Sequence, residues 1–84
     1  MKKVVFFLMI VTFAIIAKAQ NTEEISNKIY FGDFYYKLGD FEQAEKNYLE
    51  AKNMIEKEFG KEHPDYAQSL NNLGLLYKNM GNYA

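Results

Sequence analysis

Catalysis or metal binding would rest on very few side chains in this sequence. Its 84 residues include one histidine, His63, and no cysteine. A histidine acts as a general base only with a partner group in hydrogen-bond reach, and no motif places a serine–aspartate or carboxylate pair beside His63. The lack of cysteine excludes disulfides, thiolate metal sites and cysteine nucleophiles, and one imidazole does not make a histidine metal cluster. We expect no enzyme activity, no metal and no cofactor, with a structural role for His63.

Carboxylates are more numerous, and a pair of them could serve a glycosidase or hold a cation. Several glutamates are interleaved with lysines within one segment: Glu42, Glu45, Glu50, Glu56, Glu58 and Glu62. Such alternation is typical of the solvated face of a helix. The aspartates Asp33, Asp40 and Asp65 lack the spacing of a calcium loop. We expect a polar helix surface here and no site.

The first nineteen residues predict an export signal. A lysine pair follows Met1, residues 4–17 contain a single polar side chain, and Ala17-Lys18-Ala19 has the small residues of a cleavage site. The fourteen residues of 4–17 are fewer than the roughly 20 of a membrane-spanning helix, so an uncleaved anchor is the weaker alternative. We expect cleavage after Ala19, export to the periplasm or beyond the cell, and no stable membrane insertion afterwards.

Residues 20–84 are then one small domain of 65 residues, with seven lysines, no arginine and eleven acidic residues. This negative balance argues against the basic patch that a nucleic-acid surface needs. It also argues against a basic helix that lies on a membrane. We therefore expect neither nucleic acid nor a lipid surface as the partner.

Apolar residues at helical spacing predict a first helix over residues 23–38. Asn21 or Thr22 can cap its start, and Gly39-Asp40 predicts a stop followed by a tight turn. Gly32 lies inside this helix, where glycine costs about 1 kcal/mol relative to alanine. An interior glycine usually lets a second helix approach closely. We expect Ala44 of the next helix to face it.

Two more helices follow in the same pattern. The second covers residues 41–59 and ends at Gly60, and one apolar stripe runs along it: Phe41, Ala44, Tyr48, Ala51, Ile55 and Phe59. The third starts at Pro64, which suits a first helical turn, and we expect it to end at Met80 before a turn at Gly81-Asn82. Its expected stripe consists of Tyr66, Leu70, Leu73, Tyr77 and Met80.

The first and third helices share a sequence pattern at a separation of 42 residues. Phe31-Gly32, Tyr35 and Leu38-Gly39-Asp40-Phe41 return as Leu73-Gly74, Tyr77 and Met80-Gly81-Asn82-Tyr83. A fixed period of this length is the signature of a repeat architecture. Residues 25–66 form a complete repeat, and 67–84 begin a second one.

This pattern resembles the tetratricopeptide repeat, in the longer form found in the kinesin-light-chain subtype. That motif has a small residue in its first helix, an aromatic three positions on, a glycine–acid–aromatic turn, and a second helix with two buried alanines. The matching positions are Gly32, Tyr35, Gly39, Ala44, Tyr48 and Ala51, with Gly74, Tyr77 and Gly81 in the second copy. The resemblance implies an all-α fold of antiparallel helix-turn-helix repeats, as a fragment of an α-solenoid.

The resemblance also implies a partner-binding face, because the concave side of such repeats is lined mainly by the first helix of each pair. The corresponding positions are Ile29, Asp33, Tyr36, Gln68, Asn71, Asn72, Leu75 and Lys78, with Ser26, Lys37 and Asn79 beside them. Asparagine offers a donor and an acceptor together, which suits the backbone of an extended peptide. Ile29 and Asp33 stand where chaperone-binding repeats need lysine and asparagine, so chaperone C-termini are disfavoured.

We therefore expect an exported scaffold that binds a protein or peptide on this concave face. One alternative is the N-terminal regulatory region of a longer exported or membrane signalling protein, or of a protease-like enzyme. Another is an inactive gene remnant. Repeats of this kind bury their apolar faces only when about three or more stack, so we expect further repeats after Ala84.

Overall fold

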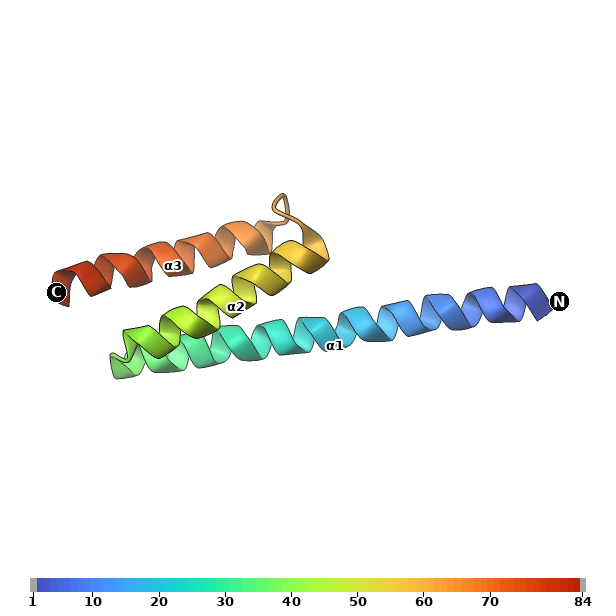
Figure 1. Cartoon of the computed structure of the whole chain (residues 1–84), viewed down its shortest axis with the longest axis horizontal. Helices are drawn as coiled ribbons and strands as arrows, with labels where there is room; N and C mark the ends of the chain where they lie inside the picture. Colours follow the sequence, from blue (N-terminus) through green and yellow to red (C-terminus); the bar gives the residue numbers. More distant parts are fainter. Residues whose placement is uncertain (1, 84) are drawn as a thin grey trace.

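The structure is a computed structural model that describes residues 2–83, with side chains at Met9, Thr12 and 21–81. It contains α1 (Lys2–Leu38), α2 (Phe41–Phe59) and α3 (Pro64–Tyr83), and no strand occurs within 2–83. Successive helices run antiparallel, and α2 packs against both of the others (Figure 1). The all-α fold expected from the sequence is confirmed. Met1 and Ala84, the outermost residues of the expected signal and second repeat, lie outside the described residues.

Helix α1 begins much earlier than the sequence predicts. The expected helix started at Glu23, whereas α1 runs without a break from Lys2 to Leu38. No glycine or proline occurs between Lys2 and Phe31, so no residue in this stretch weakens the helical hydrogen-bond ladder. Asn21 and Thr22 therefore lie inside the helix, and the prediction that one of them caps it is wrong. Within the described residues, no helix is long and apolar enough to cross a membrane.

The turn after α1 forms where Gly39-Asp40 predicts it. Gly39 has φ +79°, in the left-handed region that glycine adopts readily. Its N–H donates to the Tyr36 carbonyl at 3.1 Å, and the Asp40 N–H donates to the Tyr35 carbonyl at 2.9 Å. Asp40 then caps α2, because its carboxylate accepts from the Gln43 N–H at 3.3 Å. These short-range bonds fold α2 back along α1.

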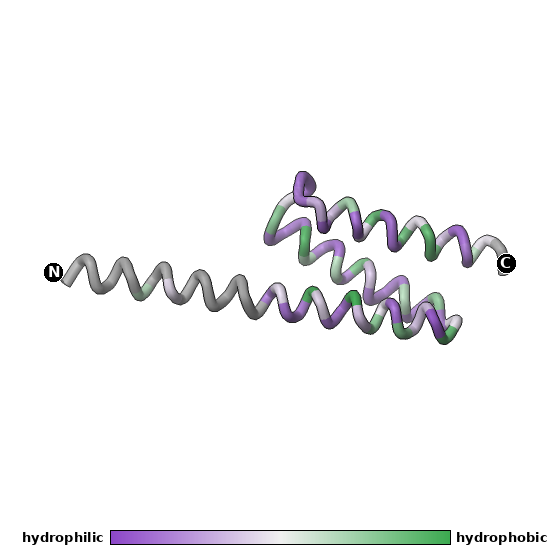
Figure 2. Tube along the Cα trace, turned by 180° about the vertical axis from the view of Figure 1, so that it is seen from behind, coloured by the Kyte–Doolittle hydropathy of each residue, from purple (hydrophilic) through white to green (hydrophobic). Residues whose placement is uncertain are grey.

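The core lies along α2. Its buried residues are four of the six in the expected stripe, Ala44, Tyr48, Ala51 and Ile55, whereas Phe41 is half-buried and Phe59 is 37% exposed. Apolar and polar positions alternate along α2 and α3 at helical spacing (Figure 2). Leu73 and Leu76 of α3 pack against Ala44 and Tyr48, so one cluster joins the last two helices. Gly60 ends α2, as predicted, and its N–H donates to the Glu56 carbonyl at 3.0 Å.

Gly32 is buried where α1 and α2 approach each other, but its neighbour differs from the expected one. A Cβ atom placed on Gly32 would lie 2.5 Å from both Cδ1 and Cε1 of Tyr48. The prediction that Ala44 faces Gly32 is therefore wrong. Ala44 lies on the side of α2 that meets α3, in the cluster with Leu73 and Leu76. The missing side chain of Gly32 makes room for an aromatic ring.

The buried face of α3 is rotated from the expected stripe. Leu73 is buried as predicted, but Leu70 is 48% and Tyr77 46% exposed. The buried positions beside Leu73 are Ser69 and Leu76. The sequence contains two overlapping apolar stripes on this helix, and the position of α2 selects one of them. Tyr77 still reaches α2 through its hydroxyl, and partial burial together with the hydrogen bond to Glu45 raises its pKa.

The expected turn at Gly81-Asn82 is absent, because α3 continues through both residues to Tyr83. Nothing lies within 4 Å of a Cβ placed on Gly74 or on Gly81. No described helix packs on this side of α3, so no tertiary contact favours a left-handed residue over one more helical turn. Gly74, which matches Gly32 in the repeat pattern, therefore makes no such close approach.

Candidate functional site

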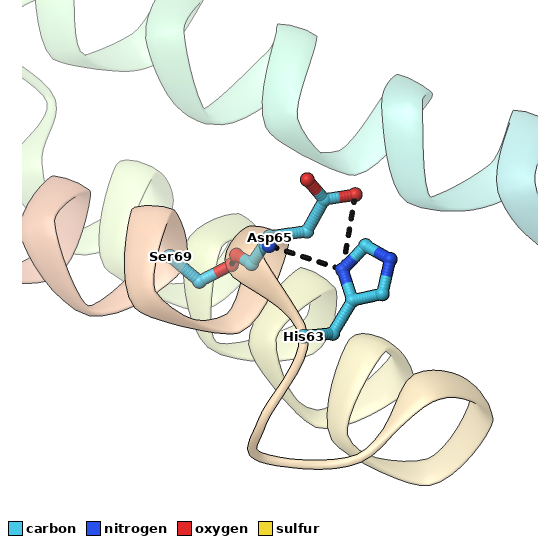
Figure 3. Close-up of polar contacts among 3 residues, drawn as sticks. All are labelled: His63, Asp65 and Ser69. Carbon is cyan, nitrogen blue, oxygen red and sulfur yellow. Dashed lines mark hydrogen bonds and ion pairs between the residues drawn. The ribbon is translucent and has the colours of Figure 1, made fainter.

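The only imidazole lies at the start of α3, beside an aspartate and a serine (Figure 3). His63 Nδ1 accepts a hydrogen bond from the Asp65 N–H at 3.1 Å and lies 3.7 Å from Asp65 Oδ2. The Ser69 hydroxyl donates to the Asp65 main-chain carbonyl at 3.0 Å. The His63 and Phe59 rings lie 4.8 Å apart. Histidine, aspartate and serine are also the residues of a hydrolytic triad, so the hydrogen bonds among them decide whether they could act as one.

The geometry is that of a helix cap. A triad needs the serine hydroxyl bonded to the imidazole, and an Nδ1–H that donates to the aspartate. Here Nδ1 accepts from the Asp65 N–H, the Ser69 hydroxyl is directed to the Asp65 carbonyl, and Ser69 is 4% exposed. No nucleophile–base pair results. His63 immediately precedes Pro64, and it accepts a hydrogen bond from the second N–H of α3. This is the kind of structural role expected for His63.

Replacing His63 with alanine is expected to lower the free energy of unfolding by about 1 kcal/mol, because the cap of α3 is lost. His63→Asn, whose amide oxygen can accept the same bond, should retain most of the stability. The exposed neighbour Glu62 provides the control, since Glu62→Ala removes no cap. Urea unfolding followed by circular dichroism measures all three. Equal losses for His63→Ala and Glu62→Ala would contradict the capping role.

A concave feature lies at the other end of the helices, where α1 ends and α3 passes beside it. A surface cavity of about 630 Å³ is lined there by Tyr36, Lys37, Leu38, Gly39, Phe41 and Asn79. The lining comes from all three helices and the first turn. The Gly39 turn brings Phe41 next to Tyr36, with ring centroids 5.8 Å apart. This volume lies within the usual range of ligand pockets, about 300–1,000 Å³.

One hydrogen bond joins the two helices that face each other across the cavity. Asn79 Nδ2 of α3 donates to the Tyr36 hydroxyl oxygen of α1, although the two residues are 43 positions apart in sequence. Because α1 and α3 run in the same direction (Figure 1), the end of α1 lies beside the last turns of α3. The bond therefore fixes the width of the groove at this point.

A second polar contact joins α1 to α2. The Tyr48 hydroxyl donates to Asp33 Oδ1, so the carboxylate of α1 holds the ring that packs on Gly32. Burial of Tyr48, followed by the hydrogen bond and charge of Asp33, raises the pKa of Tyr48 strongly. Asp33, expected to face a partner, is exposed, and its carboxylate also accepts a hydrogen bond from Tyr48 of the fold.

The raised pKa of Tyr48 predicts a loss of stability in alkali. A tyrosine of the unfolded chain ionises near pH 10, before Tyr48 of the folded chain does. The contribution of this group is thus complete below about pH 10 and decreases as the pH rises toward the folded-state value. Unfolding free energies measured from pH 8 to 11 should fall more steeply for the natural chain than for Tyr48→Phe. Identical slopes for the two proteins would show that folding does not raise the pKa of Tyr48.

The remaining candidate residues are distributed along the two groove helices and do not line the cavity. Ile29 is half-buried on α1. On α3, Gln68 Nε2 donates to Asn72 Oδ1 at 3.2 Å, so these two amides bind each other within one helix. Asn71, Leu75 and Lys78 are exposed. The structure therefore brings together only Tyr36 of the main candidates, with Lys37 and Asn79 from beside them.

Sequence reasoning missed Leu38 and Phe41 as cavity residues, because Phe41 was assigned to the apolar stripe of the second helix and Leu38 to the repeat pattern. Their place on either side of the Gly39-Asp40 turn is the signal that could have indicated them. It also missed the Lys28–Glu50 ion pair, 2.6 Å long, which joins α1 to α2 and lowers the pKa of Glu50. Within the described residues, no three histidine or acidic side chains gather as a metal site would require.

Comparison with known proteins agrees with this architecture. The family model of the tetratricopeptide repeat matches residues 23–84, which is more than half of the chain. No curated protein and no solved structure matches the sequence. Repeats of this family are typically non-catalytic modules that bind other proteins. The matched residues contain the antiparallel pair of α1 and α2, the glycine turn between them, and α3 stacked on the pair, so the chain belongs to the tetratricopeptide repeat family.

Proposed function

We propose that this chain is an exported scaffold that binds a protein or peptide along the groove between α1 and α3. The observation that carries the proposal is the cavity at Tyr36 and Asn79, where a hydrogen bond joins two helices that are distant in sequence. Family membership supports protein binding in general. The cavity supports this particular face, because aromatic walls with a few converging polar groups are typical of a binding site.

The exposed positions of α3 extend this face beyond the cavity. Leu75 is 59% exposed, and Asn71 and Lys78 are exposed beside it. An apolar side chain flanked by amides and a cation suits a peptide that lies extended along the helix, since its backbone needs donors and acceptors and its side chains need apolar contacts. These residues are the ones we propose to touch the partner.

A photo-crosslinking residue placed at Leu75 tests this proposal in extracts of the source cells. We expect Leu75 to yield a covalent adduct with a partner protein, and a crosslinker at the exposed Asn53 of α2 to yield none. The two positions are both exposed, so a difference reports the face and not accessibility. Adducts of equal yield from both positions, or from Asn53 alone, would refute binding through the groove.

Export is the second part of the proposal, and the lysine pair, the apolar residues 4–17 and Ala17-Lys18-Ala19 support it. In a bacterial host, the protein recovered outside the cytoplasm should begin at Gln20 when its N-terminus is sequenced. Ala19→Arg should block cleavage, because the site requires a small side chain, while Thr22→Arg should not. Recovery of the full-length chain in the cytoplasm for every variant would contradict export.

We also propose the kinesin-light-chain subtype, with further repeats beyond Ala84. The 42-residue period and the exposed stripe of Leu70, Gly74 and Tyr77 support this, since a following helix would cover that stripe. An antibody against residues 64–80 should detect a native protein longer than 84 residues. Additional 42-residue periods in it would support the scaffold. A membrane span with a catalytic domain would favour the alternative of a regulatory region.

A further inference from the structure

We infer that two copies of this chain associate through the outer face of α1, as an antiparallel helix pair whose two-fold axis lies close to Phe34. This face is different from the groove of the proposed function, and only Leu38, at its end, also borders the cavity at Tyr36. Three observations support the pairing: an uncovered aromatic stripe on α1, a spacing that makes the stripe self-complementary, and the apolar area that pairing would bury.

The stripe is left uncovered by the fold. Helix α2 packs on one side of α1, and no helix of the described residues lies on the opposite side (Figure 1). Phe31 and Phe34 are each 47% exposed and Leu38 is 66% exposed. Tyr30, which is 66% exposed, meets the Phe31 ring edge to face, with ring centroids 5.6 Å apart. A contiguous apolar patch of this kind often marks a site of protein association.

The stripe matches itself when a second copy is turned end for end. Phe31, Phe34 and Leu38 lie three and four positions apart, so they form one line along the helix. A two-fold axis close to Phe34 then places Phe31 of each copy against Leu38 of the other, and the two Phe34 rings beside each other. Apolar residues at this spacing are those that join helices in coiled-coil packing.

The charges along α1 favour the antiparallel orientation. Asn27, Phe31, Phe34 and Leu38 occupy the line of contact, and none of them is charged. Glu24 lies on the same line, seven positions before Phe31. A parallel pair would bring the Glu24 carboxylates of the two copies together, and like charges that meet in an interface weaken it. An antiparallel pair centred close to Phe34 places each Glu24 beyond the end of the other α1.

The apolar area is sufficient for a dimer. At roughly 200 Å² for each large side chain, the exposed fractions of Tyr30, Phe31, Phe34 and Leu38 amount to roughly 450 Å² on one copy and 900 Å² on two. Apolar atoms supply about 56–65% of a protein interface, so complete burial corresponds to roughly 1,400–1,600 Å² in total. Specific interfaces bury about 1,200–2,000 Å². A single pair of helices covers part of this area, so we expect a dissociation constant in the micromolar range.

Sedimentation equilibrium of the 84-residue chain measures this association. We expect a reversible change from the 9.8 kDa monomer to a dimer at micromolar concentration. Phe34→Glu places a carboxylate against its own copy at the two-fold axis and should weaken the dimer at least ~10-fold. Leu70→Glu is the matched control, because Leu70 of α3 is 48% exposed, and it should leave the dissociation constant unchanged. Both side chains are exposed, so both variants should keep the helical circular dichroism of the natural chain.

Two further substitutions test the antiparallel register. Phe31→Glu alone and Leu38→Lys alone should each weaken the dimer at least ~5-fold, because each places an unpaired charge in the interface. The variant that combines them should associate more tightly than either, since each carboxylate then meets an ammonium group of the other copy. The two positions are about 10 Å apart along α1, so the new charges do not pair within one copy. In a parallel pair like charges would meet, and the combined variant would associate least.

A chain that stays monomeric at millimolar concentration would overturn this pairing. Association that Phe34→Glu leaves unchanged would overturn it as well, because the contact would then run through another surface, such as residues 4–17 or α3. A combined variant that associates less than both single variants would refute the antiparallel register. Groove binding is tested separately: a crosslinker at Leu75 should give the same adducts in Phe34→Glu as in the natural chain. Loss of the dimer with retained adducts therefore leaves the proposed function intact, and a dimer without adducts leaves the pairing intact.

Discussion

Leu76→Ala should lower the free energy of unfolding by about 2–5 kcal/mol, the range for a fully buried leucine. Leu76 has no exposed surface, and it packs in the cluster that joins α3 to Ala44 and Tyr48 of α2. A chain this small has a total stability of only a few kcal/mol, so the loss is expected to detach α3. Urea unfolding by circular dichroism would report lower stability, and the Asn79 amide resonance would move as its bond to Tyr36 breaks.

The adjacent leucine is the control for this experiment. Leu75→Ala removes the same atoms from a side chain that is 59% exposed, and its effect should stay within about 0.5 kcal/mol. In the proposed function this variant instead weakens partner binding. Equal destabilisation by Leu75→Ala and Leu76→Ala would mean that α3 meets α2 through a different face from the one described here.

Gly32→Ala and Gly74→Ala should change stability in opposite directions, although the two glycines hold the same position in the 42-residue pattern. A Cβ on Gly32 would lie 2.5 Å from two ring atoms of Tyr48, so the helices would have to separate. Such overpacking costs about 1–3 kcal/mol, which exceeds the gain of about 1 kcal/mol from replacing a helical glycine. Thermal unfolding of Gly32→Ala should therefore occur at a lower temperature.

Gly74→Ala has no such penalty, because nothing lies within 4 Å of the added atom. Alanine has a higher helix propensity than glycine, so this variant should raise the stability of the 84-residue chain by up to about 1 kcal/mol. The double variant Gly32→Ala with Tyr48→Leu, which removes the ring, should recover part of the loss at Gly32. If Gly32→Ala proved stabilising, the close packing of Tyr48 on α1 would be refuted.

These effects bear on the proposed groove because α3 carries Asn79. The cavity exists only when α3 is docked on α2 and α2 is docked on α1. A variant that loosens either contact should lose peptide binding together with stability. Leu75→Ala, which changes an exposed side chain of this face, should lose partner binding alone.

The sequence by itself determined the features that depend on neighbours within about four residues. The bounds of α2, the turn at the left-handed Gly39, and the start of α3 at Pro64 all follow from local hydrogen bonding and backbone freedom. Each of these preferences is satisfied inside one turn of helix, so residue type and spacing are enough to predict it. The 42-residue period also indicates the family.

Only the tertiary structure decided how the helices are rotated against one another. That rotation placed Tyr48, and not Ala44, on Gly32, buried Leu76 in place of Leu70 and Tyr77, and engaged Asp33 in the fold. It also brought Tyr36 and Asn79 together across 43 residues and formed the cavity beside Lys37. An amphipathic pattern restricts the buried face of a helix to a broad arc, and the position within that arc is set by side chains of another helix, which sequence spacing does not contain.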